Sequence, residues 1–106
     1  VLTGRLILTG DCDDYAVEKF RRVIAAGWGR AARLVIAYAG EPHMVLAIEA
    51  HHRWLVLDNR HPGLWDAAAP RFGGYVWKCR SVPGRLRWER LEGRAATLED
   101  ALRRAT

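Results

Sequence analysis

A cysteine stands at the start of an amphipathic segment, with aspartates on both sides of it, in the stretch GDCDD at residues 10–14. Asp11 is a good N-cap residue, because its carboxylate can accept hydrogen bonds from free backbone N–H groups of a first helical turn. Apolar residues then recur with helical spacing, which predicts a helix over residues 12–26 that ends at Gly27. The apolar face of this helix consists of Cys12, Ala16, Phe20, Val23 and Ile24.

Cys12 therefore has two interpretations. At a helix N-terminus the partial positive charge favours a thiolate, which is the form that acts as a nucleophile. A cysteine on an apolar helix face can equally be a small core residue. The helical pattern alone leaves both open.

The rest of the chain is rich in short β-type segments. Five apolar runs bounded by Gly, Pro or polar residues predict strands, with a loop over residues 59–73 and a short C-terminal helix over residues 97–105. One helix, a run of antiparallel strands and a terminal helix indicate an α+β fold in a single domain, residues 1–106, with its core in about residues 9–90. The predicted strands are residues 34–38, 43–49, 53–58, 75–80 and 86–90.

The second and third strands are joined so tightly that they predict a hairpin with residues 50–52 at its turn. A two-residue loop at Ala50-His51 sets His43 opposite Asp58, and one at His51-His52 sets them diagonally. Both loops put His43 and Asp58 on one face, because side chains alternate along a strand. Their apolar neighbours on that face are Val45, Ala47, Trp54 and Val56.

A helix bearing Cys12, packed over this face, would complete a Cys–His–Asp set. His43 would act as the base for the thiol, Asp58 would fix the imidazole tautomer, and the backbone N–H of Cys12 would stabilise an oxyanion. Three alternatives stay open. His43 can be structural, Asp58 can begin a turn, and Cys12, His43 and Cys79 can be zinc ligands without the usual close pairs. We expect the other histidines, His51, His52 and His61, to face solvent.

Both faces of the predicted sheet are apolar, since Met44, Leu46, Ile48, Leu55 and Leu57 alternate with the residues named above. We therefore expect cover on both sides, from the lead-in residues, the terminal helix or a partner chain.

Composition excludes several other classes of protein. The formal net charge is +5, but the arginines are dispersed and form no basic run with interleaved aromatics, so no nucleic-acid binding is expected. No apolar run is long enough for membrane insertion. Two cysteines are too few for a disulfide scaffold.

Three blocks resemble the bacterial transglutaminase-like cysteine peptidase family, a part of the papain-like superfamily. They are GDCDDYA at residues 10–16, PHMVLA at 42–47 and WLVLDN at 54–59. The resemblance covers about residues 9–80 and implies a papain-like or transglutaminase-like fold. It also implies a peptidase that cleaves a protein substrate through an acyl-enzyme, with Cys12 as nucleophile, His43 as base and Asp58 as orienting acid.

The same resemblance implies calcium, because its adhesin-cleaving periplasmic members bind Ca²⁺ through acidic residues beside the cysteine. The matching residues here are Asp11, Asp13 and Asp14, and capping of the helix is the alternative role for all three. Shorter relatives occur in phages, so the setting is periplasmic for the first kind and virion or cytoplasm for the second. About nine residues precede the motif, so we expect a substrate cleft that is either incomplete or completed by a partner chain.

Two rival functions remain at this point. The same three residues support acyl transfer to an amine, as in transglutaminases, and a phage or scaffold protein could keep the fold without catalysis.

Overall fold

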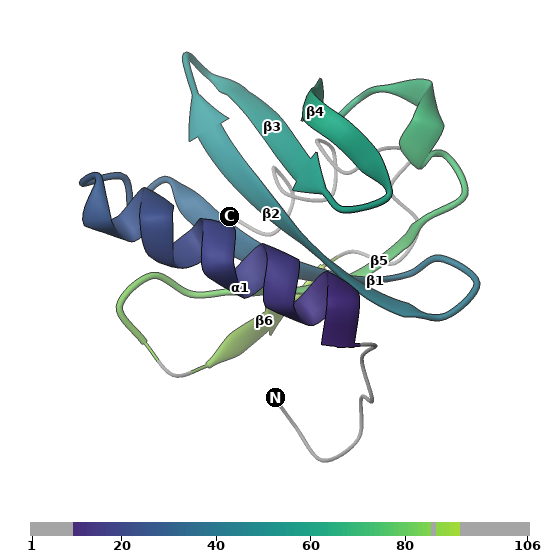
Figure 1. Cartoon of the computed structure of the whole chain (residues 1–106), viewed down its shortest axis with the longest axis horizontal. Helices are drawn as coiled ribbons and strands as arrows, with labels where there is room; N and C mark the ends of the chain where they lie inside the picture. The colour runs from purple at the N-terminus through teal and green to yellow at the C-terminus, as the bar shows by residue number, and fades with distance from the viewer. Residues whose placement is uncertain (1–9, 86, 92–106) are drawn as a thin grey trace.

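The computed structural model describes residues 10–85 and 87–91, and only the backbone for residues 10–13. Within these residues one α-helix packs against one six-stranded antiparallel sheet of order β4-β3-β2-β1-β5-β6 (Figure 1). The predicted α+β class is therefore confirmed. The elements are α1 (Gly10–Ala25), β1 (Ala32–Tyr38), β2 (Pro42–Ala50), β3 (Arg53–Asp58), β4 (His61–Asp66), the 3₁₀ turn η1 (Pro70–Phe72), β5 (Val76–Ser81) and β6 (Trp88–Arg90).

Helix α1 carries Cys12 in its first turn, as the sequence predicts. Because the helix begins at Gly10, Asp11 is its second residue and the predicted N-cap role of Asp11 is wrong. At the other end the prediction holds: Gly27 has a φ of 92°, its N–H donates to Ile24 O at 2.9 Å, and Trp28 N–H donates to Val23 O at 3.0 Å. This pair of bonds is a Schellman stop, in which only glycine takes a positive φ without steric cost.

The β2–β3 hairpin has a two-residue turn at His51-His52, with Ala50 paired to Arg53. Both turn residues have positive φ, 52° and 65°, as in a type I′ turn whose twist matches that of the strands. This is the second of the two predicted registers, and it sets His43 diagonally across from Asp58 on the same face.

The prediction of a loop over residues 59–73 is wrong in part, because this segment contains strand β4 and the turn η1. Pro62 argued against a strand, but β4 lies at the edge of the sheet, where a missing N–H costs no ladder bond. Gly63, with a φ of 99°, lies where the β3–β4 register shifts. The sequence of this irregular strand therefore shows little of the alternation of apolar and polar residues by which strands are predicted.

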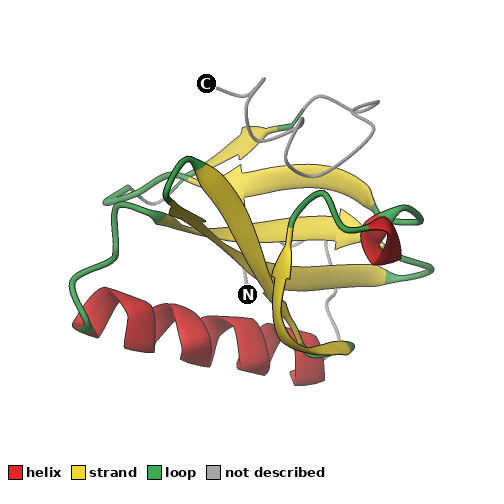
Figure 2. Ribbon diagram, turned by 90° about the horizontal axis from the view of Figure 1, so that it is seen from above, coloured by secondary structure: helices red, strands yellow, loops and turns green. Residues whose placement is uncertain are grey.

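Helix α1 covers one face of the sheet (Figure 2). Ala16, Phe20 and Val23 of the helix pack on Met44 and Leu46 of β2, both of which are fully buried. Ile24, predicted to share this apolar face, is instead 48% exposed.

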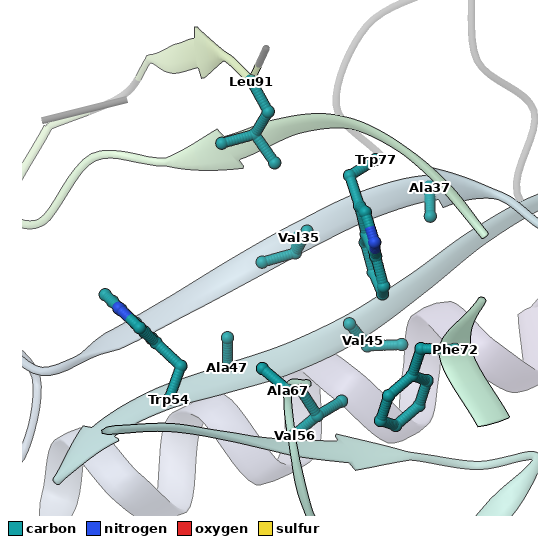
Figure 3. Close-up of a cluster of buried hydrophobic side chains, with 10 residues drawn as sticks. All are labelled: Val35, Ala37, Val45, Ala47, Trp54, Val56, Ala67, Phe72, Trp77 and Leu91. Atoms are coloured by element: carbon teal, nitrogen blue, oxygen red, sulfur yellow. The ribbon is translucent and has the colours of Figure 1, made fainter. Parts of the chain in front are cut away.

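The opposite face holds the second core, which Figure 3 shows on the side of the sheet away from α1. The segment between β4 and β5 covers it through Ala67 and Phe72. Cover on both faces is therefore confirmed, but α1 and this segment supply it and were not among the expected sources. The cluster consists of Val35, Ala37, Val45, Ala47, Trp54, Val56, Ala67, Phe72, Trp77 and Leu91.

His43 and Asp58 share the face of this second core, so the expectation that α1 packs over them is wrong. Alternation groups residues by face, but with both faces apolar it does not say which face the helix covers.

Strands β5 and β6 agree with prediction, and the turn between them includes Gly84 at a φ of 68°. The lead-in residues 1–9 and the predicted helix over residues 97–105 lie outside the described residues. Among those described, no helix combines the length and apolarity required to cross a membrane.

Candidate active site

A buried imidazole–carboxylate pair lies at the open end of the β2–β3 hairpin. His43 is the second residue of β2 and Asp58 is the last residue of β3, and their exposed fractions are 1% and 0%. His43 Nε2 lies 2.7 Å from Asp58 Oδ1. Burying two such groups is unfavourable unless they are hydrogen-bonded to each other, which is the arrangement found.

Asp58 accepts two further hydrogen bonds. The backbone N–H of Arg60 donates to Oδ1 at 2.9 Å, and the Tyr75 hydroxyl donates to Oδ2 at 2.5 Å. The first bond, from residue i+2, is the turn-forming bond expected of an Asp after a strand. Asp58 therefore begins a turn, as one of the predicted alternatives has it, and is hydrogen-bonded to His43 at the same time.

These contacts control the ionisation of Asp58. Burial raises the pKa of the carboxyl, but the hydrogen bonds from His43, Tyr75 and the Arg60 backbone, with the charge of His43, hold that pKa below its ordinary value. Burial, followed by the hydrogen bond to Asp58 and its charge, raises the pKa of Tyr75. Asp58 is thus an anion near neutral pH and Tyr75 is a neutral donor to it.

An ionised Asp58 also fixes the tautomer of His43. A carboxylate only accepts, so Nε2 of His43 must carry the proton that lies between them. In neutral imidazole Nδ1 is then the unprotonated nitrogen. The described residues supply no hydrogen-bond partner to Nδ1, and this nitrogen can accept a proton.

The Arg60 side chain joins two loops at this end of the sheet. Its guanidinium donates to Ala39 O at 2.8 Å and to Glu41 Oε2 at 2.9 Å. Ala39 and Glu41 belong to the β1–β2 connection that leads directly into His43. Arg60 therefore holds the start of β2 against the turn that follows Asp58.

The first turn of α1, which contains Cys12, lies near this end of the sheet. The first turn of α1 and the start of β2 lie at the same end of the sheet in both ribbon views (Figures 1 and 2). The side chain of Cys12 lies outside the described part of the chain, so its contact with His43 stays a prediction.

The acidic residues around Cys12 are part of the helix. Asp14 is exposed, and the side chains of Asp11 and Asp13 lie outside the described residues. The metal-binding role of Asp11, Asp13 and Asp14 therefore stays a prediction. The described side chains include no cluster of three or more His, Cys, Asp or Glu that could hold a metal.

Cys79 is separated from the His43–Asp58 pair by the sheet. Its half-buried thiol packs with the α1-facing core, is not in a disulfide, and has a pKa raised by burial. His43 lies on the other face, so the zinc set of Cys12, His43 and Cys79 does not form.

The remaining histidines divide into two kinds. His51 and His52 are exposed at the hairpin turn, as predicted. His61 corrects the prediction, because it is half-buried and its ring lies edge-on to Phe72 at 5.6 Å between centroids. It also lies 6.3 Å from the ring of Tyr75.

Tyr75 and Arg60 are the two contributors that sequence reasoning missed. The sequence pattern places Tyr75 in a strand, and its approach to Asp58 depends on how the segment after β4 folds back. Arg60 acts on Asp58 through its backbone N–H, and the turn propensity of Asp58-Asn59 was the one signal for that bond.

A family model described as bacterial transglutaminase-like cysteine proteinase (BTLCP) matches residues 7–95, which include Cys12, His43, Asp58 and Tyr75. Neither the curated proteins nor the solved structures gave a match.

Proposed function

Because this chain belongs to the bacterial transglutaminase-like cysteine proteinase family, we propose that it hydrolyses a peptide bond through an acyl-enzyme on Cys12. The substrate is a protein or peptide, and the fold is of the papain-like kind. The observation that carries this proposal is the buried, hydrogen-bonded His43–Asp58 pair.

In the proposed reaction His43 Nδ1 takes the proton of the Cys12 thiol, and the thiolate attacks the carbonyl carbon of the scissile bond. The C–N bond breaks as the imidazolium gives that proton to the leaving amine, which leaves a thioester on Cys12. Water, deprotonated by the same nitrogen, then attacks the thioester carbon; the C–S bond breaks, the carboxylic acid leaves, and the imidazolium returns its proton to the Cys12 sulfur. Asp58 keeps Nε2 protonated and stabilises the imidazolium in both halves.

The helix contributes its first turn to the same chemistry. The N-terminal partial charge lowers the pKa of a thiol placed there, and the free N–H groups of the first turn suit an oxyanion. Since α1 covers the face opposite His43, the proposal requires that the thiol meet Nδ1 around the end of the sheet, where α1 and β2 both begin.

Calcium is a separate part of the proposal. We propose that the carboxylates beside Cys12, those of Asp11, Asp13 and Asp14, hold Ca²⁺. A bound cation would offset the negative charge near the thiol. We expect EGTA to slow the alkylation of Cys12 and added Ca²⁺ to restore it. Equal alkylation rates with and without EGTA, together with no heat on calorimetric titration with Ca²⁺, would leave these residues as helix-terminal charges.

Incubation with a proteome-derived peptide library, followed by mass spectrometry of new N-termini, tests the hydrolytic function directly. The wild-type protein should create new termini and the Cys12→Ala variant should not, with an unchanged Tm. The matched control is Cys79→Ala, which should retain cleavage because that thiol lies on the other face.

The rival functions give different results in the same assay. Incorporation of a fluorescent primary amine into protein, without new termini, would indicate acyl transfer. Absence of both reactions, with a Cys12 that iodoacetamide and E-64 do not label, would indicate a non-enzymatic protein that keeps the fold.

A further inference from the structure

Tyr75 adds a third side chain to the His43–Asp58 site. Its hydroxyl donates to Asp58 Oδ2 at 2.5 Å, while His43 occupies Oδ1 of the same carboxylate. The edge of one ring also meets the face of the other, since the planes of Tyr75 and His43 are 82° apart with centroids at 5.7 Å. One residue therefore contacts both members of the pair.

The position of Tyr75 is itself fixed by aromatic packing. Its ring lies 5.5 Å from that of Phe72 and 5.1 Å from that of Trp77, and both neighbours are buried. Its backbone N–H donates to Phe72 O at 3.0 Å, immediately before β5 begins. With the ring held in this way, the hydroxyl has little freedom to leave Asp58.

The hydrogen bonds determine the orientation of the carboxylate. If all donors met Oδ1, the Asp58 carboxylate could rotate about its Cβ–Cγ bond and keep one of those hydrogen bonds. A third donor, on Oδ2, fixes the plane in which Oδ1 faces Nε2 of His43. A bond from a neutral hydroxyl to a carboxylate is also among the stronger hydrogen bonds in proteins.

We propose that Tyr75 is a positioning residue for the His43–Asp58 pair, which holds the carboxylate in plane and shields its bond to the imidazole from water. This inference rests on the proposed function for its effect on catalysis, but its structural part can be tested without any turnover. It implies that a tyrosine hydroxyl, and not only an aromatic ring, is required before β5.

The test compares Tyr75→Phe with Tyr38→Phe, a control tyrosine that is 48% exposed on β1. Phenylalanine keeps the ring packing, so Tyr75→Phe should fold. Two readouts apply: the His43 tautomer and pKa from ¹⁵N NMR of the imidazole, and the alkylation rate of Cys12. We expect Tyr75→Phe to reduce the Nε2–H tautomer and to slow alkylation on the order of tenfold. Tyr38→Phe should change neither.

A second variant keeps the test valid if Tyr75→Phe fails to fold. In a Tyr15→Phe, Tyr38→Phe background, 3-fluorotyrosine at position 75 keeps the shape and makes the phenol a stronger donor. Relative to the same background with an unmodified Tyr75, it should increase the Nε2–H tautomer of His43, and an unchanged tautomer would overturn the positioning role.

The outcomes separate the two proposals. A His43 tautomer and pKa unchanged in Tyr75→Phe, with wild-type alkylation, overturn the positioning role and leave the peptidase proposal intact. An altered His43 in Tyr75→Phe, in a protein whose wild-type Cys12 is inert, supports the positioning role and overturns the peptidase proposal.

Discussion

Asp58 is the residue on which the hydrogen bonds of the candidate site converge. Its carboxylate receives three donors inside the protein, and removal of the charge changes each of those bonds. Asp58→Asn keeps the turn oxygen but loses the anion that keeps Nε2 of His43 protonated. In serine proteases the equivalent substitution costs on the order of 10⁴ in kcat. We expect a large loss of Cys12-dependent cleavage, and a loss below about tenfold would show that Asp58 is a turn residue only.

The depressed pKa of Asp58 also predicts how stability depends on pH. The folded pKa lies below the unfolded value, so the unfolded state binds more protons between the two. The stabilisation is therefore complete above the ordinary Asp pKa of about 3.9 and is lost as pH falls through the folded pKa.

Urea unfolding of wild-type protein and Asp58→Asn from pH 6 to pH 2 measures this contribution. Protonated Asp58 resembles Asn in charge, so the stability difference of about 2 kcal/mol expected at pH 6 should shrink below pH 4. A difference that stays constant over that range would contradict the assigned ionisation of Asp58.

The hairpin turn is the element whose sequence fits its conformation least well. His51 and His52 both take positive φ, which costs a residue other than glycine about 1 kcal/mol or more. Replacing them by Asn-Gly, the preferred type I′ pair, should raise the free energy of unfolding by about 1–2 kcal/mol. The turn lies at the far end of the hairpin from His43, so Cys12 alkylation should not change. A lower Tm in thermal unfolding would contradict the turn assignment.

The end of α1 allows a test with a matched pair of glycines. Gly27 has a φ of 92°, and Gly29, two residues later, is outside the positive-φ region. Alanine at position 27 should destabilise the protein by about 1–2 kcal/mol, because its Cβ meets the backbone in the left-handed conformation. At position 29 a Cβ would lie 3.5 Å from Ile24, an ordinary contact, so Gly29→Ala should have little effect. Equal losses in chemical denaturation would contradict the Schellman stop.

At the scale of the whole molecule, local pattern predicts most of the fold. The helix, its glycine stop and five of the strands follow from periodicity and turn residues, and the shared face of His43 and Asp58 follows from an even-length hairpin loop. Strand β4 could not be predicted, because Pro62 and Gly63 remove the alternation and its partner strand supplies the order instead.

The candidate site is harder to predict from local sequence pattern than the fold is. The side of the sheet that α1 covers depends on packing between elements, and both faces offer an apolar surface. Tyr75 contacts Asp58 across seventeen positions of sequence, through a segment whose path is set by Phe72 and Trp77. Contacts of that kind have no local signature.

The central claim is that His43 activates Cys12, and the pH dependence of Cys12 alkylation tests it most directly. Iodoacetamide labelling, quantified at each cysteine by mass spectrometry, compares wild-type protein with His43→Gln and with His51→Gln as the exposed control. An isolated thiol has a pKa of about 8.5 and reacts slowly at pH 6. We predict that wild-type Cys12 still reacts quickly at pH 6, that His43→Gln lowers this rate at least about tenfold, and that His51→Gln does not change it. Identical profiles for wild type and His43→Gln, each rising only at the pKa of an ordinary thiol, would contradict the claim.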